Sequence, residues 1–369
     1  MSIPSKKEVP SMNEEKVIKL KENRVWRIYL GGKLLDEFRF EQGSDGYFPE
    51  DWIASVVKAN NPDREGKPEN EGLTASSNGD YLRDIIESEP QKILGKAHVD
   101  KLGDNFGVLT KFLDSAERLP IQVHPDKKAA KELFHSDYGK TEAWYILGGR
   151  EIDGEQPYIL LGFKSGADRE TLKSLFDKQD IAGMAALMHK IPVHPGDTFL
   201  IKGGTPHAIG PGCFLLEIQE PTDYTISLEK CNTLGEKLPD FLCHQGIGFE
   251  KMFDCFHYDN RSLESILGEF KLEPELCEAA EGYTKTKIIS YNDTPCFSLN
   301  RYDVKNKCSL PACERARAFV IIDGEGELDG ISFKRGESAF IPAQNGSIIA
   351  TPSEHGMTLL ECLPPHIEE

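Results

Sequence analysis

Four residues in three short stretches carry the side-chain types that bind metal ions. Gln122 and His124 are separated by one residue, Glu142 follows later in the chain, and His207 ends a Gly-Thr-Pro-His sequence. An amide oxygen, two imidazoles and a carboxylate suit a first-row divalent metal and leave room for water or substrate. The sequence therefore predicts a metal-dependent enzyme, and the alternative interpretation is a buried polar network without a metal.

Predicted β-strands must bring these residues together. Gln122 and His124 lie two positions apart on one predicted strand, so their side chains point to the same side. Glu142 begins the next predicted strand, and His207 follows a turn that leads into another. Short strands with Gly and Pro turns are typical of a β-barrel or jelly roll, in whose interior the four side chains could converge.

The length of the chain favours more than one domain. At 369 residues it exceeds what a single simple core usually holds. We expect a leader (1–20), a metal-bearing domain (21–250) with helical insertions at about 49–90 and 167–189, a connector (251–283) and a second barrel (284–369) without metal ligands. The first of these insertions is predicted to start a helix at Pro49, because proline followed by acids suits a first turn.

A short internal repeat supports two related barrels. Residues 196–201 and 336–341 share a glycine, an acid, a hydroxyl and a hydrophobic strand at an offset of 140. In the same register His207 falls on Ser347, and the second half contains no His-x-His or Gln-x-His sequence. We therefore expect only the first barrel to hold a metal.

Charge and hydropathy exclude several classes of partner. The formal net charge of −18 argues against nucleic acid, whose phosphates attract positive charge. No apolar run approaches the roughly 20 residues that span a bilayer, and the polar start of the chain does not look like a secretory signal. The simplest expected location is the cytoplasm.

Cysteine usage and the remaining histidines suggest no second metal site. The nine cysteines are scattered without a Cys-x-x-Cys pair, which predicts reduced and mostly buried thiols. His189 and His194 are close in sequence but have no carboxylate at a useful spacing, so both are interpreted as surface residues.

The site motifs resemble those of the cupin superfamily, and more closely those of the type I mannose-6-phosphate isomerases. The specific motifs are Gln-x-His-Pro-Asp at 122–126 and Lys-Thr-Glu-x-Trp-Tyr at 140–145. Further stretches that resemble the family's sequence lie at 111–114, 119–121, 195–197 and 204–209. The resemblance spans about 24–364, is densest over 106–227, and implies a mainly β fold with two cupin (double-stranded β-helix, jelly-roll) barrels and helical insertions.

The resemblance also implies residue roles. The family's zinc ligands match Gln122, His124, Glu142 and His207. Lys140 matches a lysine at the substrate, and Lys111 and Asp223 match further pocket positions. The implied reaction interconverts mannose 6-phosphate and fructose 6-phosphate through a cis-enediol, with one divalent metal. Zinc is implied, although these ligands also suit iron, manganese, cobalt or nickel. The partner implied is a small sugar phosphate, and the oligomeric state is not readable.

Two residues depart from the family pattern. The family usually has an arginine four residues after the aspartate that matches Asp223, where this chain has Ser227, and often a serine where it has Pro120. Three readings follow: an isomerase whose missing charge comes from Lys202 or Lys230, an isomerase of a different sugar, for example an unphosphorylated one, or a non-catalytic metal-containing sugar-binding cupin. A single-residue change at Ser227 is a fourth. We favour the sugar-phosphate isomerase, because a storage or binding barrel does not need Lys140 beside a metal carboxylate.

Overall fold

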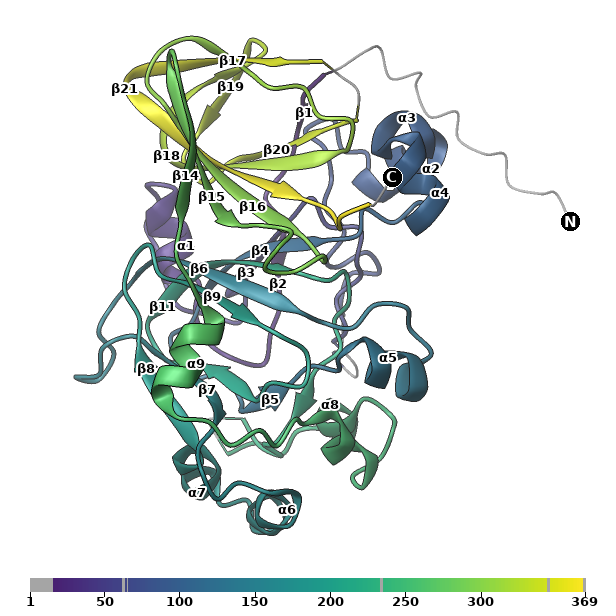
Figure 1. Ribbon diagram of the computed structural model, residues 1–369, viewed down its shortest axis with the longest axis vertical. Coiled ribbons are helices and arrows are strands. Elements are labelled where there is room, and N and C mark those ends of the chain that lie inside the picture. The colour runs from purple at the N-terminus through teal and green to yellow at the C-terminus, as the bar shows by residue number, and fades with distance from the viewer. Residues whose placement is uncertain (1–15, 62–63, 65, 233–234, 344–345, 368–369) are drawn as a thin grey trace, which may run out of the picture.

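Three β-sheets form the body of the protein. The computed structural model describes residues 16–61, 64, 66–232, 235–343 and 346–367. In Figure 1 the C-terminal sheet lies above the two sheets of the N-terminal part, and helices lie around their edges. The predicted mainly β class is confirmed, whereas the number of barrels stays a prediction.

The seven-stranded sheet occupies the middle of the molecule and is called the central sheet. Its order is β13-β9-β6-β11-β4-β3-β2, and its pairs are antiparallel. Its strands are β2 (Arg24–Val25), β3 (Glu50–Ile53), β4 (Leu109–Asp114), β6 (Glu142–Gly149), β9 (Thr198–Ile201), β11 (Cys213–Gln219) and β13 (Lys271–Leu272).

A five-stranded sheet, called the outer sheet, faces the central sheet. Its order is β12-β5-β10-β7-β8. Its strands are β5 (Gln122–Val123), β7 (Tyr158–Phe163), β8 (Met188–Pro192), β10 (His207–Ile209) and β12 (Ile226–Ser227). The register pairs Gln122 of β5 with His207 of β10 on one side and with Ser227 of β12 on the other. Three site positions therefore meet across adjacent strands.

The C-terminal sheet has nine strands. Its main order is β1-β20-β18-β21-β16-β15-β14, with β17 paired to β21 and β19 to β18. Its strands are β1 (Ile18–Lys19), β14 (Glu275–Ala280), β15 (Tyr283–Ile289), β16 (Ser298–Val304), β17 (Cys308–Leu310), β18 (Arg317–Leu328), β19 (Ile331–Lys334), β20 (Ser338–Ile341) and β21 (Ile348–Leu363).

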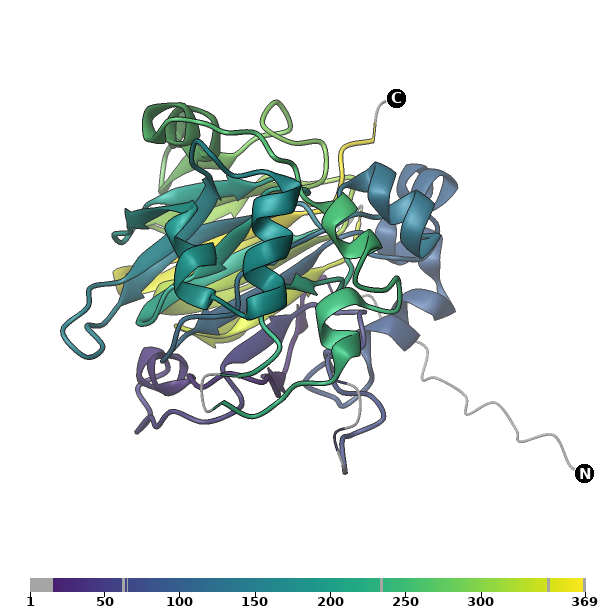
Figure 2. The ribbon, with the colours of Figure 1, turned by 90° about the horizontal axis from the view of Figure 1, so that it is seen from below.

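Short helices cover the edges and the open face of the outer sheet. They are α1 (Lys33–Phe38), α2 (Leu82–Ser88), α3 (Pro90–Leu94), α4 (Lys96–Leu102), α5 (Lys127–Phe134), α6 (Arg169–Lys178), α7 (Ile181–Ala186), α8 (Asp240–His244), the 3-10 helix η1 (Lys251–Cys255) and α9 (Leu263–Phe270). Figure 2, seen from below, shows helices crossing the front of the sheets. Asp168 caps α6, its carboxylate accepting from the Thr171 amide.

Strand alternation explains the layered packing. Along β6, Ala143 and Tyr145 belong to the apolar core shared with the C-terminal sheet, whereas Trp144 and Ile146 belong to the core shared with the outer sheet. Glu142 therefore points toward the outer sheet. The same alternation on β3, β4 and β11 places Glu50, Lys111 and Glu217 on that interior side.

The predicted helix at Pro49 is wrong. Residues 50–53 form strand β3, which pairs with β4 and is buried along its length. Trp52 and Ile53 fill the two faces, while Glu50 and Asp51 are each neutralised by an arginine. The capping pattern was overridden because tertiary ion pairs and apolar burial outweigh a local helix signal. Helices in this region begin only at Leu82 and continue to Leu102.

Two other predicted segments also differ from the structure. Of the leader, residues 1–15 lie outside the described residues, but 18 and 19 form β1, which pairs with β20 through Ile18 and Phe340. The burial of Val17, Ile18 and Leu20 explains this, because three apolar side chains gain a core. The connector is split: β13 joins the central sheet and β14 joins the C-terminal sheet.

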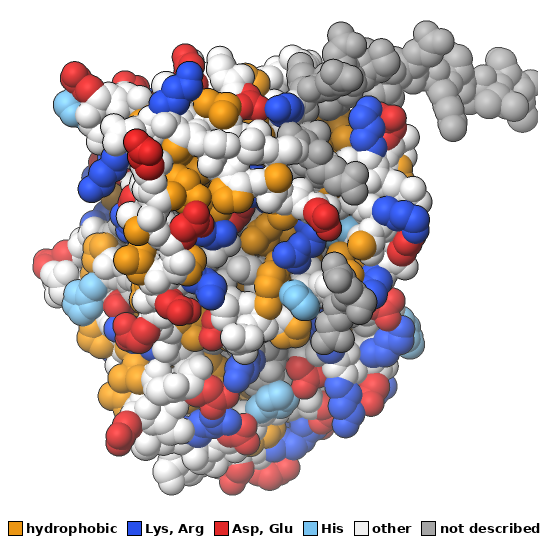
Figure 3. All heavy atoms as spheres, turned by 45° about the horizontal axis from the view of Figure 1, so that its top comes forward, with side chains coloured by type: hydrophobic (Ala, Val, Ile, Leu, Met, Phe, Trp, Pro, Cys, Tyr) orange, Lys and Arg blue, Asp and Glu red, His pale blue; other side chains and the backbone are white. Residues whose placement is uncertain are grey.

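Charged side chains of both signs share the surface, and the cysteines form no disulfide. The face in Figure 3 carries acidic and basic side chains interspersed, without a broad basic patch. All nine cysteines are free, and five of them are buried. Within the described part of the chain, none of the helices has the length and apolar character needed to cross a membrane.

Candidate metal centre and cavity

Two buried histidines present one ring nitrogen each to the same point. His124 follows β5 and His207 begins β10, and each is 1% exposed. His124 Nδ1 lies 2.8 Å from the Tyr224 carbonyl oxygen, and His207 Nδ1 lies 2.9 Å from that of Thr205. A carbonyl can only accept, so both Nδ1 atoms carry the proton and both Nε2 lone pairs are free. This is the usual support for histidine metal ligands.

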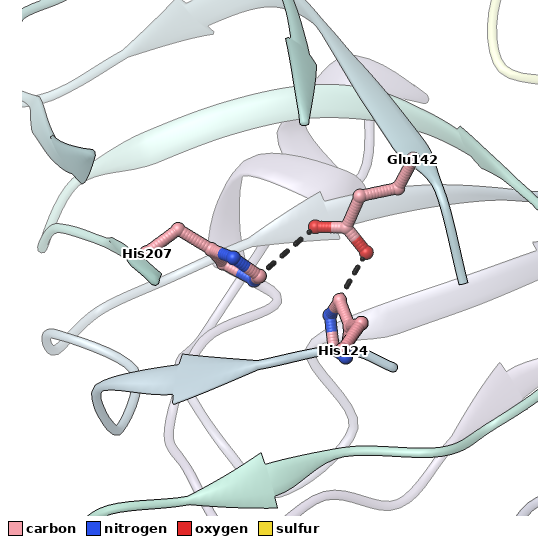
Figure 4. A group of neighbouring side chains, drawn as sticks. All are labelled: His124, Glu142 and His207. Carbon is pink, nitrogen blue, oxygen red and sulfur yellow. Dashed lines mark ion pairs between the residues drawn. The ribbon is translucent and has the colours of Figure 1, made fainter. Parts of the chain in front are cut away.

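Glu142 closes the group from the opposite sheet (Figure 4). Its Oε2 lies 3.1 Å from His124 Nε2, and its Oε1 lies 3.5 Å from His207 Nε2. The three ligand atoms lie within 4.8 Å of one another. In the described part of the chain this is the one group of three or more histidine, cysteine, aspartate or glutamate side chains arranged in this way.

The protonation states also suit a metal. Burial, with Lys140 nearby, lowers the pKa of His124 to about 3, and burial lowers the pKa of His207. Burial acts to raise the pKa of Glu142, but His124 and Lys140 outweigh it and hold that pKa well below its usual value. At neutral pH the group is therefore two neutral imidazoles and a carboxylate, the forms that bind cations. The buried Glu142 Oε2 makes no hydrogen bond, so a cation between these atoms would satisfy it.

Gln122 lies where the prediction requires it. Its amide nitrogen is 3.2 Å from His207 Nε2. Rotating the amide exchanges its nitrogen and oxygen, and the oxygen would then face the same point as the imidazoles. The four residues thus fit one divalent cation: three from the outer sheet or its extension, and one from the central sheet.

A cavity of about 120 Å³ opens beside this group. The three pocket residues that the resemblance implies line it, namely Lys140, Lys111 and Asp223, together with Pro120 and Ser227. Lys140 is 4% exposed, and its Nζ lies 3.1 Å from His124 Nε2 and 3.5 Å from Glu142 Oε2. Asn60, Thr225 and Gln245 add uncharged polar groups suited to hydroxyls.

Three charged residues of the cavity were missed by sequence reasoning. Arg27, Glu50 and Glu217 all line it. Burial raises the pKa of Glu217 to about 7, although Lys111 opposes this at 2.9 Å. Glu50 was assigned to a helix, and Arg27 lies in a segment with no motif. The available signal was weak, because Arg27 and Glu217 are single charged residues within predicted strands that are otherwise largely apolar.

The two lysines predicted to replace the family arginine lie elsewhere. Lys202 is exposed and pairs with Glu269 at 2.9 Å, and Lys230 lies over the rings of Phe176 and Phe249. Neither lines the cavity. Both lysines are close to site residues in sequence, but a side chain at the end of a strand can point away from the cavity. Of the two histidines interpreted as surface residues, His194 is exposed but His189 is buried, bonded to the Arg261 carbonyl.

Comparisons with known proteins agree with this geometry. Residues 66–142 match the family described as "Phosphomannose isomerase type I, catalytic domain". Mannose-6-phosphate isomerase ManA of Bacillus subtilis (strain 168) is 26% identical over 259 residues, which is 65% of this chain and 70% of that protein. A mannose-6-phosphate isomerase of Streptococcus mutans is 35% identical over 157 residues, 42% of this chain and 46% of that protein.

Solved structures share the fold over nearly the whole chain. The mannose 6-phosphate isomerase from Bacillus subtilis has a TM-score of 0.70 at 24% identity, covering 94% of this chain and 99% of that one. A mutant phosphomannose isomerase from Salmonella typhimurium has a TM-score of 0.67 at 17% identity, covering 95% and 100%. The similarity to these relatives indicates an isomerase, and the fold is mainly β and cupin-like. The chain is thus similar to the type I phosphomannose isomerases, through the family model over residues 66–142 and through ManA over 65% of its own length.

Proposed function

We propose that this protein is a metal-dependent aldose–ketose isomerase that interconverts mannose 6-phosphate and fructose 6-phosphate. The observation that carries the proposal is the His124, Glu142 and His207 group at one end of a cavity that also contains a buried lysine. The curated relatives with this activity in their names support the choice of substrate.

The reaction moves two protons. In the aldose-to-ketose direction the C–H bond at carbon 2 breaks, and its electron pair forms the double bond of a cis-enediol. A proton then returns to carbon 1, while another moves from the oxygen on carbon 2 to the oxygen on carbon 1. A divalent metal held by His124, Glu142, His207 and Gln122 would supply charge stabilisation for the oxyanion that develops.

Lys140 is the residue best placed to carry a proton. Its ammonium group is buried at the boundary between the ligand group and the cavity, within hydrogen-bond distance of His124 Nε2. The same group lies 3.5 Å from Glu142 Oε2 and lines the cavity, so the lysine is within reach of both the ligand group and a bound sugar. Asp223 and Lys111, on other walls, are the remaining polar groups for hydroxyls or proton transfer.

A second candidate is an isomerase of an unphosphorylated sugar. It is favoured by one observation, namely that the other two cations of the cavity are already paired with carboxylates. Arg27 contacts Glu50 and Asp223, and Lys111 contacts Glu217. A phosphate dianion would therefore depend mainly on Lys140 and on the rim of the cavity.

The test is proton exchange at carbon 2 in heavy water, with zinc-loaded protein and either mannose 6-phosphate or mannose. The proposed function predicts exchange with the phosphorylated sugar that His124→Ala abolishes. His189→Ala is the matched control, because it also removes a buried histidine but lies outside the cavity. Exchange with mannose alone would select the second candidate. Absence of exchange with both sugars, in protein that binds one metal ion, would reject the isomerase assignment.

A further inference from the structure

Arg27 brings a guanidinium group into the cavity from a distant part of the chain. It follows β2, and its side chain is 11% exposed. It lines the cavity with Lys140 and Glu142, although nothing in the sequence around it marks a site. Ser227, on the facing side, contributes no charge: its hydroxyl donates to the Glu229 carbonyl and accepts from the Glu229 amide. Of the arginines in the described chain, Arg27 is the one that lines this cavity.

All three guanidinium nitrogens of Arg27 face protein oxygens. Nε lies 3.0 Å from Glu50 Oε2, while Nη2 and Nη1 lie 3.2 and 3.3 Å from the two oxygens of Asp223. Nη1 also lies 3.3 Å from Asn61 Oδ1, and the group sits over the ring of Trp52. Burial opposes the charge, but Asp223 and Glu50 raise the pKa of Arg27 above its usual value. The fork geometry thus fixes two carboxylates that come from different segments.

The contacts of Arg27 continue as a series of alternating charges along the cavity wall. The order is Asp223, Arg27, Glu50, Lys111, Glu217. Glu50 also accepts from the Tyr29 hydroxyl and the Trp52 indole, both at 2.6 Å. Asp223 also accepts from the Asn60 backbone amide at 2.9 Å. Without Arg27, Asp223 would lose its charge partner and Glu50 would depend on Lys111 at 3.8 Å.

We propose that Arg27 is a positioning residue for the isomerase reaction. It fixes Asp223 at the cavity wall and, through Glu50, fixes Lys111, so that both face the sugar in one arrangement. Arg27 is not the anchor of the phosphate group, because protein oxygens already occupy its fork. The inference rests on the proposed function, and it assigns the guanidinium of this cavity to a segment 196 residues away from Asp223.

The substitution that tests this is Arg27→Lys, which keeps the positive charge but removes the fork. Arg39→Lys is the matched control. Arg39 is also buried, pairs with Asp51, and lies over an aromatic ring, that of Phe112. Asp51 follows Glu50 on β3 and points to the opposite face, away from the cavity. The two variants therefore make the same chemical change to a buried pair, and only one of them changes the cavity.

Four quantities are measured on both variants: kcat and KM for mannose 6-phosphate, the metal content, and the Kd for sorbitol 6-phosphate, a polyol that cannot isomerise. We expect Arg27→Lys to lower kcat by about tenfold or more relative to Arg39→Lys. We expect KM, metal content and the sorbitol 6-phosphate Kd to stay within about threefold. A loss in kcat without a loss in binding is what a displaced acid–base group produces.

Two results would overturn the inference. If Arg27→Lys kept its kcat within about threefold of the Arg39→Lys value, the fork would have no role in turnover. If kcat were kept while KM and the sorbitol 6-phosphate Kd rose by about tenfold or more, Arg27 would bind the phosphate instead. Failure of the proposed function is distinguishable from both, because the wild-type protein would then show no exchange at carbon 2.

Discussion

The central and C-terminal sheets place their strands in the same order and register but carry opposite charges at one matching interior position, Glu142 and Arg317. The central order β3-β4-β11-β6-β9 corresponds to β15-β16-β21-β18-β20. Glu142 pairs with Ile201 in one sheet, and Arg317 pairs with Ile341 in the other. The repeat of 196–201 at 336–341 fixes this equivalence, since β9 and β20 begin and end at matching positions.

The equivalence extends to the neighbouring strands. Glu217 lies opposite Trp144, and Glu361 lies opposite Phe319. Beyond them, Lys111 corresponds to Asn300. Both glutamates are buried on the interior side of their sheets.

The two interiors neutralise their buried carboxylates in different ways. In the C-terminal sheet, Arg317 takes the position of Glu142, the proposed metal ligand, and pairs with Glu361. In the central sheet, Glu142 is a carboxylate between two neutral imidazoles. Arg317 is the positive partner of Glu361, whereas Glu142 has Lys140 Nζ at 3.5 Å and keeps one buried oxygen, Oε2, that makes no hydrogen bond.

The largest expected difference between the sheets comes from removing one glutamate at a time. Glu142→Gln should abolish metal binding and lower kcat by about a thousandfold or more, with a small effect on folding. Glu361→Gln should lower the free energy of unfolding by about 3–5 kcal/mol, because Arg317 is left buried and unpaired, while the folded protein keeps its kcat. Denaturant unfolding and kinetics on both variants provide the check. A lower metal content in the Glu361→Gln variant would contradict this difference between the two sheets.

Adding an arginine at Ser227 should lower turnover and not raise it. Arg27 already supplies a guanidinium to this cavity, and the cavity of about 120 Å³ has little room for a second. We expect Ser227→Arg to lower kcat/KM for mannose 6-phosphate by about tenfold. Ser227→Ala is the control for loss of the hydroxyl. An increase in kcat/KM for Ser227→Arg would show that the cavity lacks a charge that Arg27 does not supply.

Acid stability should report the charges around Glu50. Burial acts to raise its pKa, but Arg27 and Lys111 outweigh it and lower that pKa from 4.5 to about 2. A lowered folded-state pKa stabilises the protein above the unfolded value, and this contribution is lost as pH falls from about 4.5 to 2. The difference in unfolding free energy between wild type and Glu50→Gln should therefore shrink over that range. A difference that stays constant with pH would contradict the ion pairing of Glu50.

The smallest effects are expected at the two lysines outside the cavity. Lys202→Ala removes a surface ion pair with Glu269, and Lys230→Ala removes a cation over two rings. Each should change the free energy of unfolding by about 1 kcal/mol or less and kcat/KM by less than about threefold. Steady-state kinetics on both variants provide the measurement. A loss of kcat/KM of about tenfold at either lysine would show that this lysine takes part in the site.

The sequence predicts the ligand group better than the surroundings of the cavity. The clustering of Gln122, His124, Glu142 and His207 could be predicted, because short motifs contain them and strand periodicity orients them. Arg27 and Glu50 could not, because their roles arise from pairing across segments that are far apart in the chain. The helix predicted at Pro49 failed for the same reason: Trp52 and Glu50 gain more from burial and ion pairs than from a local cap.

Anomalous diffraction from crystals of the zinc-loaded protein tests the central claim most directly. We predict one strong peak among His124 Nε2, His207 Nε2, Glu142 and the Gln122 amide oxygen, and no peak in the interior of the C-terminal sheet beside Arg317 and Glu361. A peak in that interior, or an empty ligand group with zinc bound elsewhere in the chain, would contradict the assignment of the two sheets.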